Sequence, residues 1–188
     1  MKNNKRLLVV GGTGRDVGKT EFICQLLKKI SVTHEVYALK VSAIFPDEDL
    51  FHGSHDESES RLHLYEELNA STTKDTSRML RAGAKKVFYL RSDDAGILDG
   101  YRNFVNQIPP KAIVICESNS LGQFIKPGIS IVVKALHKPI KERAIVLLES
   151  ANLVVNSDCI SGFPELESVC YSETGGWKLQ SKTEVNFD

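Results

Sequence analysis

Short apolar runs alternate with amphipathic segments along the whole chain. The apolar runs predict six β-strands, at residues 6–10, 36–41, 86–90, 112–116, 129–135 and 153–155. Several of them are apolar at successive positions, which is typical of strands covered on both faces, as in a parallel sheet. Between them, apolar residues at helical spacing predict helices at residues 19–30, 76–82, 97–107 and 141–151. This alternation predicts an α/β three-layer sandwich with a mostly parallel central sheet and right-handed crossovers.

One segment, residues 45–73, departs from this alternation. It is polar and acidic, with Asp47, Glu48, Asp49, Asp56, Glu57 and Glu59. We expect residues 45–73 to form a long excursion with a short helix at residues 60–68, and we expect the whole excursion to act as a switch or to cover a substrate. Elsewhere no linker or internal repeat divides the chain, and its 188 residues fit one domain, residues 1–188.

Trp177 follows two glycines, and we expect it to anchor the C-terminal segment by packing.

Composition narrows the class of protein. Lys plus Arg and Asp plus Glu each number 24, so the net charge is zero and we expect neither nucleic acid nor membrane as a partner. The first apolar run ends at Val10. This run is too short for the core of a signal peptide or for a membrane span. The four cysteines form no Cys-x-x-Cys pair. We therefore expect reduced thiols and a cytoplasmic protein.

The strongest chemical signal is a glycine-rich segment between the first strand and the first helix. It reads Gly12-Thr13-Gly14-Arg15-Asp16-Val17-Gly18-Lys19-Thr20 and continues into Glu21. Glycines let backbone N–H groups converge on phosphate oxygens, and the helix adds the positive end of its dipole. We expect all ten residues to bind a nucleoside triphosphate, with Lys19 on the β- and γ-phosphates and Thr20 on Mg²⁺.

The spacing within this segment differs by one residue from the common phosphate-binding pattern. Five residues separate Gly12 from Gly18, where the common form has four. The alternative is a glycine-rich turn that holds no ligand. Arg15 is suited to bidentate contact with phosphate, whereas Asp16 is unfavourable there unless it meets a metal or a cationic group.

Polar residues follow the other predicted strands, and in open parallel sheets ligands bind at the carboxyl ends of strands. Glu117 ends the fourth strand, where a carboxylate holds Mg²⁺ through a water or orients a nucleophile. Lys40 ends the second, where it neutralises a transferring phosphoryl group or binds a small anionic second substrate. Asn156 follows the last strand and is a candidate to read the base. For each of these three residues, the alternative is a solvated polar side chain at a strand exit. The choice between ATP and GTP stays open.

The glycine-rich segment resembles that of dethiobiotin synthetase and of the cobyrinic acid amidotransferases. These families share the Gly-Thr start, an acidic residue before Val-Gly-Lys-Thr and the five-residue spacing. They also carry a lysine and a glutamate at the strand ends that correspond to Lys40 and Glu117. The resemblance implies a P-loop nucleoside triphosphate hydrolase fold, which accounts for the unusual spacing.

A second resemblance is to molybdopterin-guanine dinucleotide biosynthesis protein B (MobB). The segment that begins Lys74-Asp75-Thr76-Ser77-Arg78 and ends Ala82-Gly83-Ala84 is similar to one in that family, which is also a single domain of this length. The two resemblances cover residues 6–42, 74–92 and 112–118. MobB proteins have a shorter loop, a His-rich stretch where this chain has residues 41–45, and Gly-Phe where it has Ser118-Asn119-Ser120.

Together the resemblances imply a function. The overall layout is closest to MobB, which implies Mg²⁺-dependent binding and hydrolysis of ATP or GTP, and a partner protein in cofactor assembly. One alternative is a ligase of the dethiobiotin synthetase type, which activates a carboxylate with ATP. Another is a nucleotide-dependent switch that binds without hydrolysis. By analogy with these families, we also expect a homodimer.

Overall fold

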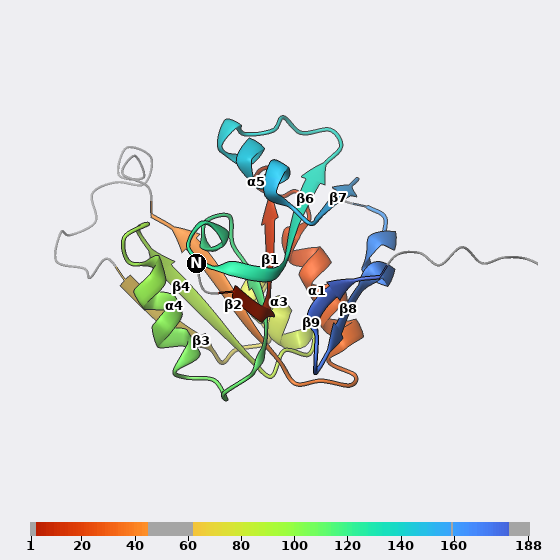
Figure 1. Cartoon of the computed structure of the whole chain (residues 1–188). Coiled ribbons are helices and arrows are strands. Elements are labelled where there is room, and N and C mark those ends of the chain that lie inside the picture. Colours follow the sequence, from red (N-terminus) through yellow and green to blue (C-terminus); the bar gives the residue numbers. More distant parts are fainter. Residues whose placement is uncertain (1–2, 45–61, 159, 181–188) are drawn as a thin grey trace, which may run out of the picture.

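A seven-stranded sheet forms the centre of the molecule (Figure 1). The computed structural model describes residues 3–44, 62–158 and 160–180. The strand order is β3-β4-β2-β5-β1-β6-β7, and every pairing is parallel except β3 with β4. The strands are β1 (Asn3–Gly12), β2 (Val36–Ala43), β3 (Leu62–Glu67), β4 (Lys86–Ser92), β5 (Ile113–Glu117), β6 (Lys126–Ala135) and β7 (Leu153–Ser157).

Helices cover both faces of this sheet and complete three layers (Figure 1). On one face, α1 (Lys19–Ile30) and α3 (Asp75–Arg81) pack on a core that includes Phe22 and Met79. On the other, α4 (Ile97–Val105) buries Ile97 and Phe104 against Phe88 of β4. The predicted α/β architecture with a mostly parallel central sheet is therefore confirmed. No helix in the described ranges is long and apolar enough to cross a membrane.

The first helix begins and ends where its sequence predicts. Apolar residues at helical spacing, among them Phe22, Ile23, Leu26 and Leu27, are fully buried on the sheet. Glu21 lies in the first turn and two lysines lie in the last, and both placements suit the helix dipole. Burial of this apolar stripe fixes the N-terminus of α1 one short loop after the end of β1.

Strand register brings three chain segments to the same level of the sheet. Val10 of β1 and Lys40 of β2 are both Cα partners of Glu117 in β5. On the other side of β1, Gly12 is the partner of Val133 in β6. The carboxyl ends of β1, β2 and β5 therefore meet at one edge.

The acidic excursion differs from its prediction. Residues 60–68 were predicted to contain a short helix, which is wrong, because residues 62–67 form the edge strand β3, antiparallel to β4. Long-range pairing with the exposed edge of β4 outweighs the weak helical preference of this polar stretch. The preceding residues of the excursion, 45–61, lie outside the described residues.

The predicted helix at residues 141–151 is shorter than expected. A 3₁₀ turn, η2 (Glu142–Ala144), leads into α5 (Ile145–Ser150), in which no residue is buried. Two further 3₁₀ segments are η1 (Leu121–Gln123) and η3 (Pro164–Ser168).

A C-terminal hairpin, β8 (Val169–Ser172) and β9 (Gly176–Leu179), packs beside the first strand. Trp177 is buried, and its indole N–H donates to the Arg6 carbonyl at 3.0 Å. Gly176 has a φ of +78°, and a Cβ at this position would lie 2.3 Å from the Lys5 carbonyl oxygen. The expectation that Trp177 anchors the C-terminal segment by packing is confirmed.

Replacing Gly176 with Ala tests this anchor. The added methyl group meets backbone in a left-handed conformation, so we expect the free energy of unfolding to fall by about 1–3 kcal/mol. Urea denaturation followed by circular dichroism measures it. Gly122→Ala is the matched control, because a Cβ on Gly122 would meet nothing within 4 Å. Equal stability of the two variants would contradict close packing of the hairpin on β1.

Candidate functional site

A cavity of about 870 Å³ opens at the carboxyl edge of the sheet. It is bordered by the glycine-rich loop (residues 12–18), the first turns of α1 and α3, and the ends of β2, β5 and β7. Its lining residues are Arg15, Asp16, Val17, Gly18, Lys19, Thr20, Glu21, Gln25, Lys40, Ser42, Asp75, Arg78, Glu117, Ser157, Ile160, Ser161, Gly162 and Phe163. Most of the residues predicted to bind phosphate therefore line one cavity.

The glycine-rich loop takes a conformation that requires glycine at its last position. Gly18 has a φ of +97° and precedes the first residue of α1. A Cβ on Gly18 would lie 2.8 Å from the Ser157 hydroxyl oxygen, so the loop passes close to the end of β7. Asp16 also has a positive φ, of 50°. The loop therefore turns sharply between β1 and α1.

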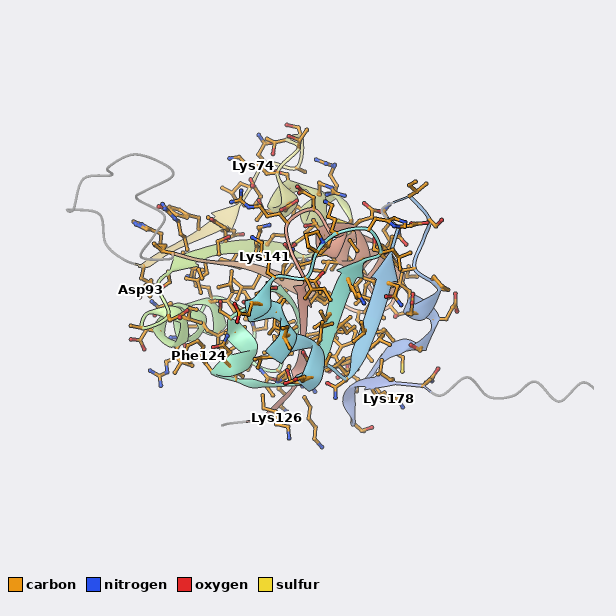
Figure 2. All side chains as sticks on the ribbon, turned by 90° about the horizontal axis from the view of Figure 1, so that it is seen from above. Lys74, Asp93, Phe124, Lys126, Lys141 and Lys178 are labelled. Atoms are coloured by element: carbon orange, nitrogen blue, oxygen red, sulfur yellow. The ribbon has the colours of Figure 1, made fainter. Side chains whose placement is uncertain are left out.

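Four hydrogen bonds hold the start of this loop. The Asn119 side chain accepts from the Gly12 N–H at 2.8 Å and donates to the Gly12 carbonyl at 3.0 Å. The Thr13 N–H donates to the Val133 carbonyl at 3.1 Å, and the Lys141 N–H donates to the Thr13 carbonyl at 3.2 Å. Figure 2, which looks down on this edge, shows Lys141 near its middle. The base of the loop is thus fixed from both sides of β1.

Several N–H groups of the loop have no backbone partner. Within the described part of the chain, the backbone N–H groups of Val17, Gly18 and Lys19 donate to no backbone acceptor. The Lys19 ammonium folds back over the loop and donates to the Gly14 carbonyl at 2.8 Å. Burial lowers the pKa of Lys19 below its ordinary value, although the nearby Glu117 carboxylate opposes this shift. These donors and this ammonium suit an anion.

A chain of polar contacts crosses the floor of the cavity. The Thr20 hydroxyl donates to Glu117 Oε2 at 2.7 Å, and both side chains are buried. The Lys40 ammonium donates to Glu117 Oε1 at 3.2 Å and also to Asp75 Oδ2. Elements far apart in sequence thereby meet, because Thr20 begins α1, Lys40 is in β2 and Asp75 begins α3.

The charged groups of these polar contacts stabilise one another. Burial alone would lower the pKa of Lys40, but the carboxylates of Glu117 and Asp75 raise it above its ordinary value. Burial would likewise raise the pKa of Asp75, but the hydrogen bond and charge of Lys40 hold it below its ordinary value. Lys40 and Asp75 therefore stay ionised at neutral pH.

Sequence reasoning missed several residues of this site. Asp75 and Arg78 belong to the segment that resembles MobB, yet no local pattern showed that α3 would face the loop. Arg78 donates to Glu21 Oε2 at 2.6 Å across the mouth of the cavity. Asn119 stands where the chain departs from MobB, and its two bonds to Gly12 give that departure a structural role. Lys138 donates to the Asp16 carbonyl at 2.8 Å.

The residues after β7 form the other end of the cavity. Ser157 and residues 160–163 contribute to the lining, whereas Asn156, predicted to read a base, is exposed and lies outside it. Asp158 Oδ1 accepts the N–H groups of Ile160 at 2.9 Å and Ser161 at 2.7 Å. These bonds lower the pKa of Asp158 to about 2 and shape the turn.

Comparison with known proteins adds no family assignment. No protein-family model matches the chain, and no curated protein matches it. Among the described residues, no group of three or more His, Cys, Asp and Glu side chains is placed to hold a metal ion by itself.

The turn after β7 gives a pH prediction. The folded-state pKa of Asp158 is depressed, so its contribution to stability is full above the ordinary carboxyl pKa of about 3.9. It is lost as pH falls through about 2. We expect the stability difference between the wild type and Asp158→Ala, measured by thermal unfolding, to be constant above about pH 5 and to shrink below about pH 4. A carboxyl-carbon NMR titration of Asp158 with a midpoint near the ordinary value would contradict the assigned bonds.

Proposed function

We propose that this protein binds a nucleoside triphosphate with Mg²⁺ and hydrolyses it. The observation that carries the proposal is the 2.7 Å bond between the Thr20 hydroxyl and the Glu117 carboxylate. Thr20 of this pair lies at the start of a helix that follows a strand and a glycine-rich loop, and three N–H groups at the end of that loop have no backbone partner. A hydroxyl beside a carboxylate under such a loop matches what a phosphate-bound Mg²⁺ requires. The alternative, a glycine-rich turn without a ligand, gives no reason to bring the half-buried Lys19 and Lys40 together with the buried Glu117.

The residues present fit Mg²⁺. This ion is usually held by one or two carboxylates together with substrate phosphates and waters, rather than by a full set of protein ligands. Thr20 and Glu117 supply a hydroxyl and a carboxylate, and Asp75 supplies a second carboxylate nearby. When bound, Mg²⁺ would neutralise charge that develops on the β- and γ-phosphates.

Each residue then has a role in positioning and charge stabilisation, which dominate phosphoryl transfer. The N–H groups of the loop hold phosphate oxygens. Lys19, released from the Gly14 carbonyl, contacts the β- and γ-phosphates. Glu117 orients the attacking water, and Lys40 stabilises charge on the phosphoryl group.

We expect no strong preference between adenine and guanine. Guanine offers an N–H and an amino group that selective sites often bind with a carboxylate, whereas adenine does not present this pair. In the described part of the turn at residues 158–163, the single carboxylate is that of Asp158, which lies outside the lining and binds its own turn. We therefore propose that ATP and GTP both bind.

A place in cofactor assembly, as in MobB, remains part of this proposal, as does a partner protein. A small anionic second substrate would enter beside Lys40, Ser42 and Arg78, which line the cavity beyond the loop. The ligase predicts hydrolysis that depends on a small carboxylate, and the switch predicts binding without turnover. A homodimer stays a prediction by analogy.

Lys19→Ala tests nucleotide binding. The variant lacks the ammonium that we assign to the phosphates, so we expect affinity for Mg·ATP and Mg·GTP to fall at least about 100-fold. Isothermal titration calorimetry measures this, and the nucleotide-induced rise in melting temperature should vanish. Lys28→Ala, at an exposed position of the same helix, is the matched control. A nucleotide affinity of Lys19→Ala within threefold of wild type would contradict the assignment of Lys19 to the phosphates.

Glu117→Gln separates binding from hydrolysis. An amide keeps a hydrogen-bond acceptor for Thr20 but loses the charge, so we expect nucleotide affinity to change a few-fold and turnover to fall on the order of 10²-fold. Phosphate release under saturating nucleotide measures turnover. An unchanged rate would remove Glu117 from the mechanism.

A further inference from the structure

Lys40 is held in a position that conflicts with its proposed role. Its ammonium donates to Glu117 Oε1 at 3.2 Å and to Asp75 Oδ2, and its side chain is only 20% exposed. Both carboxylates are thus engaged with Lys40. An ammonium held in this way is not available to a phosphoryl group or an anionic substrate.

The carboxylates of Glu117 and Asp75 explain why the Lys40 ammonium lies between them. Glu117 is nearly buried, at 7% side-chain exposure, and Asp75 is 37% exposed. Two negative charges this close repel strongly where water is scarce, so one cation between them stabilises the folded site. Lys40 supplies that cation from within the chain.

The same place suits a divalent ion. The second oxygen of Glu117 accepts the Thr20 hydroxyl at 2.7 Å, so the carboxylate that binds the Lys40 ammonium beside Asp75 also contacts a hydroxyl. Hydroxyl and carboxylate oxygens are the ligands that Mg²⁺ prefers. An ammonium and a divalent ion that share these oxygens exclude one another.

We propose that Lys40 is an internal counter-ion, which occupies the cation position of the nucleotide-free protein and is displaced when Mg²⁺ arrives with the nucleotide. This inference rests on the proposed function. Displacement frees the Lys40 ammonium inside a cavity that it shares with Lys19 and Arg78. Asp75 is then a positioning residue, since it holds Lys40 in the nucleotide-free site and releases it in the loaded one.

The proposal gives metal binding a consequence beyond charge neutralisation. Without the metal, Lys40 stays bound to Asp75 and Glu117, and the phosphoryl group lacks one of its two lysines. With Mg²⁺ held by Thr20, Glu117 and Asp75, the Lys40 ammonium would be free to join Lys19 in stabilising charge on the phosphates.

Mn²⁺ binding to the nucleotide-free chain tests this inference, with free Mn²⁺ quantified by electron paramagnetic resonance. Lys40→Met removes the counter-ion and leaves the carboxylates unpaired, so we expect Mn²⁺ affinity to rise at least about tenfold over wild type. The double variant Lys40→Met/Asp75→Asn should lose that gain. Lys86→Met is the matched control, because Lys86 is a strand lysine paired with Glu66 at 3.0 Å outside the cavity.

The melting temperatures of these variants give a second test of the counter-ion role. Lys40→Met should melt at a lower temperature than wild type in metal-free buffer, and millimolar Mg²⁺ should restore part of the loss. The double variant, which relieves the repulsion, should melt higher than Lys40→Met in metal-free buffer and should not respond to Mg²⁺.

The outcomes separate this inference from the proposed function. Equal Mn²⁺ affinity of Lys40→Met and wild type, with normal Mg·ATP binding by wild type, would overturn the counter-ion role and leave nucleotide binding intact. A wild type that binds no nucleotide, beside a Lys40→Met variant that gains Mn²⁺, would overturn the function and leave the cation position standing.

Discussion

Parallel pairing in register is the constraint on which the site depends. β5 lies between β1 and β2, and Glu117 is the partner of Val10 on one side and of Lys40 on the other. A shift of one residue would turn Glu117 to the other face of the sheet and away from Thr20. The buried apolar side chains of both cores prevent such a shift. The hydrophobic pattern of these strands therefore fixes the distance between the charged groups.

The site was predictable where its residues carry local signals. Each of four residues lies near or after the carboxyl end of a strand with a clear apolar pattern, so their meeting follows from parallel topology. These residues are Lys19, Thr20, Lys40 and Glu117. Asp75 and Asn119 were not predictable as site residues, because their roles depend on where α3 and the turn after β5 pack. The edge strand at residues 62–67 was mistaken for helix for a related reason, since its ladder partners lie at least 20 residues away along the chain.

The described residues of the cavity lining carry equal numbers of positive and negative charges. Among them are four basic and four acidic side chains, namely Arg15, Lys19, Lys40, Arg78, Asp16, Glu21, Asp75 and Glu117. Several of them pair directly, such as Arg78 with Glu21. A polyanion therefore meets no excess of positive charge, and a divalent cation is the natural compensation. This balance agrees with a ligand that arrives as a metal complex.

The hairpin that holds Trp177 joins the last described strands to the first one. Trp177 donates to the Arg6 carbonyl, and β9 packs beside β1, the strand that leads into the glycine-rich loop. During synthesis on the ribosome, β1 emerges well before this support. The strand that leads into the loop therefore lacks its hairpin packing until β8 and β9 have left the ribosome.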